Sequence, residues 1–84
     1  MPSAILRFDE ILSMKVLLYD KNHNLYLGRD GEWVRNLTRA RDFISGAAAA
    51  AYVVRHQLVS IEMVYAFADE TQNVRTPIDR LSEF

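Results

Sequence analysis

Apolar residues in the first half of the chain are spaced as in β-strands. Residues 14–20 hold four apolar side chains in succession at positions 16–19, which is typical of a strand buried on both faces. A run of turn-forming residues separates this strand from a short apolar one at 25–27. Residues 32–35, with apolar Trp33 and Val34 between polar neighbours, directly follow the hairpin signal Asp30-Gly31 and are expected to form a third strand. The pattern predicts a three-stranded antiparallel meander.

The second half of the chain predicts one helix and a further strand. Ser45 is a good N-cap and the five alanines of residues 47–51 have the strongest helix propensity, so we expect a helix over 46–57. Helical spacing selects the residues expected to face the sheet, which are Ala47, Ala50, Ala51, Val54 and Leu58. Residues 60–68 alternate between two faces and predict a fourth strand. One face carries Ile61, Met63, Tyr65 and Phe67, and the other carries Glu62, Val64 and Ala66.

These elements predict an α+β fold with the order ββ β α β. The continuous apolar run favours a central place for the first strand, so we expect the fourth strand beside it and a spatial order of 3-2-1-4. The amphipathic helix is expected on one face of this sheet. If strands three and four are parallel, the connection through the helix is right-handed.

The two ends of the chain carry shorter helical patterns. Ile5, Phe8 and Leu12 lie on one helical face, so residues 3–12 form either a short amphipathic helix or an irregular arm docked on the domain. Near the other end, a Thr-Pro-Ile-Asp sequence is typical of a helix start and predicts a short helix over 77–83.

Length and composition indicate one globular domain. We divide the 84 residues into an N-terminal extension at 1–13, a core at 14–68 and a C-terminal segment at 69–84. Half of the residues are hydrophobic and a quarter are charged, an ordinary globular balance. Because the chain has no cysteine, disulfides, thiolate metal sites and cysteine nucleophiles are excluded. Stability therefore comes from packing, alone or with self-association.

The charge balance does not favour a nucleic-acid partner. The net charge is −1 at pH 7, whereas nucleic-acid-binding domains usually carry a basic field. Residues 29–55 have a net charge of +2 and residues 56–84 a net charge of −3. No apolar run reaches the roughly 18–20 residues of a membrane span, and the first residues lack a signal-peptide pattern. We therefore expect a cytoplasmic protein with no membrane partner.

Two short sequence motifs precede the predicted helix. Residues 26–33 read Tyr-Leu-Gly-Arg-Asp-Gly-Glu-Trp, and an Ala-Arg-Asp-Phe sequence follows at 40–43. With the helix and the closing strand, they resemble small bacterial proteins of unknown function that share the pattern YLGxDGxW, AxxF, helix, strand. The resemblance covers residues 14–67. It implies the same ββ β α β fold and no particular activity.

Four arginines are the candidates for binding an anion. Arg35, Arg39 and Arg41 precede the predicted helix start at Ser45, where backbone N–H groups and the helix dipole favour negative charge. Arg55 is included as a fourth member, and guanidinium forks suit phosphate or carboxylate. The alternative is a solvated basic edge that balances the acidic last third of the chain.

The sequence predicts no catalytic, cofactor-binding or metal-binding residues. Neither His23 nor His56 has a carboxylate at a metal-ligand spacing on a helix, so both histidines are expected to be solvated. Asp20 and Asp30 stand where turns need them, which leaves acid–base catalysis by the acidic residues a weaker alternative. Trp33 is expected in the core rather than in a stacking platform for a ligand.

These observations predict a small non-catalytic protein-interaction module that self-associates. The first strand has apolar side chains on both faces, whereas one helix covers only one face, so something has to cover the second. The candidates are the terminal segments, an unidentified protein partner, or a second copy in a two-fold homodimer. The alternative functions are anion or nucleic-acid binding through the arginines and, least favoured, a small enzyme.

Overall fold

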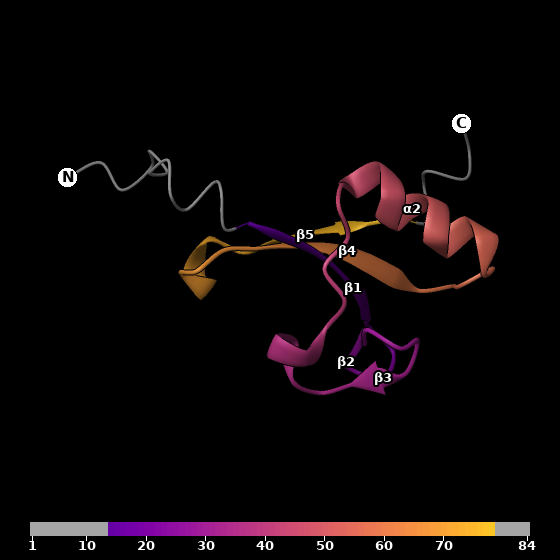
Figure 1. Ribbon diagram of the computed structural model, residues 1–84, viewed down its shortest axis with the longest axis horizontal. Helices are drawn as coiled ribbons and strands as arrows, with labels where there is room; N and C mark the ends of the chain where they lie inside the picture. Colours follow the sequence, from indigo (N-terminus) through magenta and orange to yellow (C-terminus); the bar gives the residue numbers. More distant parts are fainter. Residues whose placement is uncertain (1–13, 79–84) are drawn as a thin grey trace.

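Five strands form one antiparallel sheet in the order β3-β2-β1-β4-β5, and helix α2 lies on one face of it (Figure 1). The computed structural model describes residues 14–78, so the predictions for 3–12 and for most of 77–83 lie outside the described residues. The elements are β1 (Lys15–Asp20), β2 (Leu25–Leu27), β3 (Trp33–Val34), the 3₁₀ turn η1 (Leu37–Arg39), α2 (Gly46–Arg55), β4 (Ile61–Ala66), the 3₁₀ turn η2 (Glu70–Gln72) and β5 (Val74–Pro77). The predicted α+β fold, with the helix on one face and the order 3-2-1-4, is confirmed.

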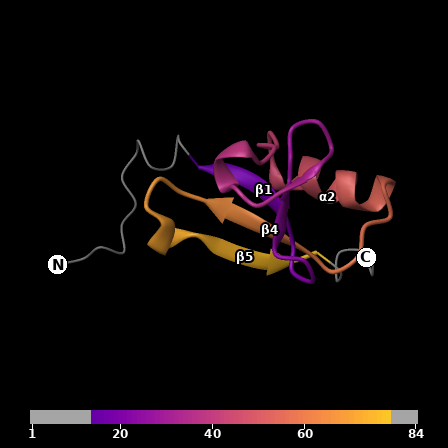
Figure 2. The same ribbon diagram turned by 90° about the horizontal axis from the view of Figure 1, so that it is seen from below.

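The pairing of β1 with β4 is the longest in the sheet. All six residues of β1 take part, from Lys15 opposite Ala66 to Asp20 opposite Ile61, and Figure 2 shows β1, β4 and β5 running side by side. Because every neighbouring pair is antiparallel, β3 and β4 also run in opposite directions. The two strands are therefore not parallel, and the rule of right-handed connections does not apply to the link through α2.

Side chains of β1 and β4 build two apolar clusters, one on each face of the sheet. The cluster beneath α2 consists of Val16, Leu18, Leu27, Phe43, Ala49, Val53, Ile61, Met63 and Ile78. The cluster on the opposite face consists of Leu17, Tyr19, Ala40, Val64 and Ala66. Trp33 is half-buried and packs against the first cluster, so it lies at the border of the core.

The connection from β3 to α2 covers part of the second face. Leu37 and Ala40 pack on the side opposite α2, whereas Phe43 belongs to the cluster beneath the helix. Bridges from Ala40 to Gly28 and from Phe43 to Val16 hold the segment against the sheet. In Figure 1, the magenta turn of η1 lies below β1, β4 and β5, whereas α2 lies at the upper right of the sheet. An internal segment thus covers part of the second face of the sheet. The sequence had predicted the chain ends or a partner as the cover of this face.

The set of residues predicted to face the sheet from α2 is partly wrong, because the helix is rotated about its axis relative to the prediction. Three members of the predicted set are exposed: Ala47, Ala51 and Val54. Ala49 and Val53 are buried against the sheet instead. Gly46 explains this rotation, because a Cβ on it would lie 2.6 Å from the Tyr65 hydroxyl oxygen and 3.2 Å from the Met63 sulfur. Residues three and seven positions after Gly46 share its face of the helix, and these are the two buried residues.

The segment before Ile78 is a strand, so the predicted helix start at Pro77 is wrong. β5 pairs with the outer edge of β4 and places Pro77 opposite Glu62. The next N–H along the chain, that of Ile78, donates to the Ile61 carbonyl at 3.2 Å. Because hydrogen-bonded and non-hydrogen-bonded pairs alternate, the nitrogen of Pro77 faces away from β4. Proline is tolerated at such an edge position because no ladder hydrogen bond is lost there.

The C-terminal end of α2 is closed by a Schellman motif. The Leu58 N–H donates to the Val53 carbonyl at 3.0 Å, and the Gln57 N–H donates to the Val54 carbonyl at 3.2 Å. Gln57 has a φ of 54°, which is the left-handed conformation that this motif requires and that glycine usually supplies. The helix end is thus well bonded but holds a strained residue.

Replacing this residue tests the strain. Gln57→Gly is expected to raise the free energy of unfolding by about 0.5–1 kcal/mol, because removing the left-handed penalty outweighs the greater freedom of glycine in the unfolded chain. Urea unfolding followed by circular dichroism measures the change. Arg55→Gly, two residues earlier and within α2, is the control and is expected to destabilise by about 1 kcal/mol. If Gln57→Gly destabilises as much as the control, the strain is absent.

Candidate functional site

An apolar groove lies where α2 ends and β4 begins. Its volume is about 510 Å³, and it is lined by Val53, Val54, Gln57, Leu58, Val59, Ser60 and Ile78. Val53 and Ile78 also belong to the buried cluster beneath α2, so the core itself forms the floor of the groove. Sequence reasoning missed this site, because its lining comes from a helix, a loop and the residue after β5.

Two valines stand exposed at the rim of the groove. Val54 is 61% exposed and Val59 is 75% exposed. Both Gln57 and Ser60 adopt left-handed conformations, and the sharp chain path between them leaves Val59 facing solvent. No residue of the lining is titratable, and only Gln57 and Ser60 carry polar side chains. The site therefore offers apolar contact with few polar groups.

A third exposed apolar side chain stands at the start of α2. Ile44 is 94% exposed and precedes Ser45, whose hydroxyl accepts the Ala48 N–H at 3.1 Å and caps the helix as predicted. An apolar residue before the cap often packs on the residue five positions later. Here that residue is Ala49, which is fully buried against the sheet. The rotation of α2 thus explains why Ile44 is left exposed.

The four arginines predicted to bind an anion lie on different elements. All are exposed: Arg35 after β3, Arg39 at the end of η1, Arg41 before α2 and Arg55 at the end of α2. The Arg41 guanidinium lies over the rings of Phe43 and Tyr52, 5.1 and 5.3 Å from their centres. Arg55 stands nine residues beyond the helix start, about 14 Å along its axis. Anion binding by this set stays a prediction.

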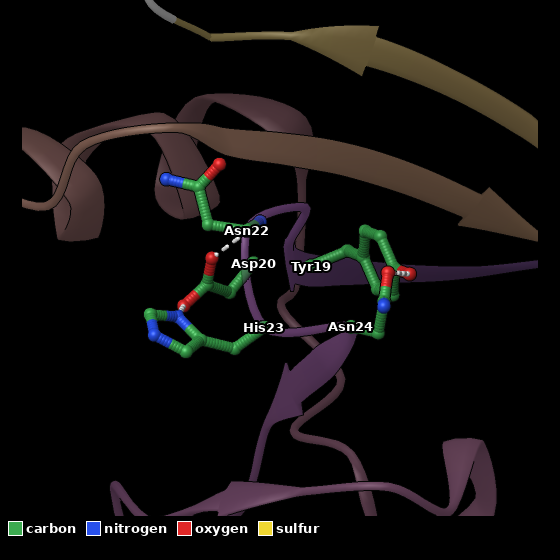
Figure 3. A network of polar contacts seen from close by, with 5 residues as sticks. All are labelled: Tyr19, Asp20, Asn22, His23 and Asn24. Atoms are coloured by element: carbon green, nitrogen blue, oxygen red, sulfur yellow. Dashed lines mark hydrogen bonds and ion pairs between the residues drawn. The ribbon is translucent and has the colours of Figure 1, made fainter.

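The turn between β1 and β2 brings an acid and a histidine together. Asp20 Oδ2 lies 2.7 Å from His23 Nδ1, and Asp20 Oδ1 accepts the Asn22 N–H at 2.9 Å (Figure 3). On the other side of the turn, the Tyr19 hydroxyl donates to Asn24 Oδ1 at 2.7 Å. The predicted turn role of Asp20 is confirmed. The predicted exposure of His23 is confirmed too. Its pairing with Asp20 was missed, because a spacing of three residues was considered only within a helix, whereas these two residues lie in a turn.

Opposing effects act on the carboxyl group of Asp20. Partial burial acts to raise its pKa, but hydrogen bonds from His23 and from the Asn22 N–H, together with the charge of His23, outweigh that effect. The pKa of Asp20 therefore lies below its ordinary value of 3.8. The carboxylate form is thus favoured by its neighbours in the turn.

Two other acidic side chains, Asp42 and Glu32, bind backbone N–H groups. Asp42 accepts the Val16 N–H at 3.2 Å and helps to hold the connecting segment on β1. Glu32 accepts the Asp30 N–H at 3.0 Å within the hairpin turn. Between residues 14 and 78, no group of three or more His, Cys, Asp or Glu side chains is placed to hold a metal ion.

Comparison of the chain with models of protein families, with curated proteins and with solved structures gives no match. The resemblance to small bacterial proteins therefore stays a prediction. In the described part of the chain, no helix has both the length and the apolar character that crossing a membrane requires.

Removing the histidine of the turn tests the origin of the pKa shift. In His23→Ala, the pKa of Asp20 is expected to rise, because partial burial remains while a hydrogen bond and a positive charge are lost. A carboxyl NMR titration measures it. The pKa of Asp69, which hydrogen bonds from the Thr71 hydroxyl and N–H hold below its ordinary value, is the internal control.

The same pair sets a pH dependence of stability. Because folding lowers the pKa of Asp20, its contribution is present above pH 3.8 and is lost as the pH falls through the folded value. The stability difference between the original protein and His23→Ala should therefore shrink below that pH. An Asp20 pKa that is the same in both proteins would rule out the pairing in solution.

Proposed function

We propose that the protein is a non-catalytic interaction module that self-associates, with the groove at the end of α2 as its contact surface. The observation that carries the proposal is an open apolar groove of about 510 Å³ with Val54 and Val59 exposed at its rim. Burying apolar surface contributes about 25 cal/mol per Å², so a second copy that covers this region gains free energy. The net charge of −1 keeps repulsion between copies small. A cytoplasmic location is part of the same proposal.

The edges of the described sheet are less suited to association than the groove. β3 is only two residues long, and β5 presents Pro77, whose nitrogen has no hydrogen to donate. Short edge strands and edge prolines are devices that discourage pairing between sheets. These features support the groove, rather than an extended sheet, as the contact surface.

The alternative functions have less support. Anion binding needs several arginines at one place, whereas Arg41 lies against aromatic rings and Arg55 stands at the far end of α2 from the N-cap. Catalysis needs groups that transfer protons or attack a substrate, and the seven residues lining the groove include no titratable side chain. The lining therefore favours binding.

A matched pair of substitutions tests the contact surface. Size-exclusion chromatography with light scattering is expected to give a mass that rises above the monomer value of 9.7 kDa as concentration increases over a hundredfold range. Val59→Asp should stay monomeric, because association would bury its charge without a partner. Val74→Asp alters an exposed valine on β5 and should associate like the original protein.

Two results would contradict this proposal. The first is a monomer mass for the original protein at every concentration. The second is equal association of the original protein and Val59→Asp, which would move the contact away from the groove. Circular dichroism of both variants confirms that the exposed substitutions leave the fold intact.

A further inference from the structure

The geometry points to a particular pairing of two copies, which rests on the proposed self-association: the two α2 helices pack antiparallel about a two-fold axis, and Ile44 of each copy enters the groove of the other. Ile44 is the most exposed large apolar residue described, at 94%, and it directly precedes α2. The groove directly follows α2. A protruding side chain and a hollow therefore stand at opposite ends of one helix.

An antiparallel arrangement gives a contact to both ends of each α2 helix at the same time. It sets the start of one helix beside the end of the other, so each Ile44 meets a groove and each groove receives one side chain. A two-fold interface uses the same surface patch of both copies, and this patch is complementary to itself. A parallel arrangement would place Ile44 beside Ile44 and leave both grooves empty.

The outward face of α2 permits close approach of the two helices. Ala47, Ala51 and Val54 are exposed along it at helical spacing with short, uncharged side chains, and the exposed Arg55 follows Ala51 by four residues at the C-terminal end of this face. α2 is only about 15 Å long, so contact between the helices alone falls short of the roughly 800 Å² that each partner buries in a standard interface. The groove contacts at both ends supply the additional buried surface.

One pair of opposite charges, Asp42 and Arg55, lies at the two ends of α2. Asp42 stands before the helix and Arg55 ends it, and both are exposed. Antiparallel packing brings Arg55 of one copy toward Asp42 of the other, twice in each dimer. The helix dipoles also run in opposite directions, so the positive end of each lies beside the negative end of its neighbour. The other charge before α2, Arg41, is held over the Tyr52 ring.

The register of the pairing places one residue on the symmetry axis. Leu58 lines the groove, and with Ile44 seated against it the midpoint falls at Ala51. Packed helices lie about 8–10 Å apart with Cα atoms about 2.3 Å from each axis, so the two Ala51 Cα atoms come within range of a disulfide. Because the chain has no cysteine, a single introduced cysteine reports on this contact.

Cysteine cross-linking of the full chain tests the register. Ala51→Cys is expected to form a covalent dimer under mild oxidation, seen as a doubled mass on a non-reducing gel. Ala68→Cys replaces another exposed alanine, outside the inferred interface, and should remain largely monomeric under the same conditions. In parallel, Ile44→Asp should lose association in light scattering while keeping the circular dichroism spectrum of the original protein.

The outcomes separate this inference from the proposed function. A protein that associates and needs Val59, but gives no preferential Ala51→Cys cross-link or tolerates Ile44→Asp, self-associates through the groove in another arrangement, and the antiparallel pairing is wrong. A protein that is monomeric throughout overturns both proposals. Selective cross-linking at residue 51, together with loss of association in Ile44→Asp, supports the pairing.

Discussion

The fold depends on the burial of β1 on both of its faces. Leu17 and Leu18 are fully buried although their side chains point to opposite sides of the sheet, so each side requires its own cover. One amphipathic helix cannot supply both covers. The chain meets this constraint by packing Leu37 and Ala40 on one side and then passing along the sheet edge to Phe43 on the other. The order of elements between β3 and α2 follows from that requirement.

The sequence predicted the elements of this fold better than their orientation. The apolar run of β1, the alternation in β4 and the alanines of α2 are local signals, and each identified its element. The rotation of α2 is not local, because consecutive alanines look alike on every face of a helix. Contact between Gly46 and the side chain of Tyr65 favours one face, and it involves residues that are far apart in the sequence. The helix start predicted at Pro77 was wrong for a related reason, because proline is favoured at the first position of a helix and is also tolerated in an edge strand where its nitrogen faces away from the neighbouring strand.

The candidate site was less predictable than the fold. The groove combines the end of α2, the loop after it and Ile78, and only the pairing of β5 with β4 brings that last residue there. The arginines show that nearness in sequence does not place residues on one element, because Arg35, Arg39, Arg41 and Arg55 lie on different parts of the fold. The guanidinium group of Arg41, for example, lies over the ring of Tyr52, a residue of the following helix. The pair of Asp20 and His23 required knowledge of the turn conformation, which spacing alone does not give.

The proline of β5 also bears on what happens when many copies are crowded together. A sheet grows into a fibre only if its edge offers a repeating set of donors and acceptors to the next chain. Pro77 removes a donor from the outward side of β5, and β3 at the opposite edge is only two residues long. Neither edge is a good template for adding strands without limit. The protein can therefore display an apolar surface while its sheet resists polymerisation.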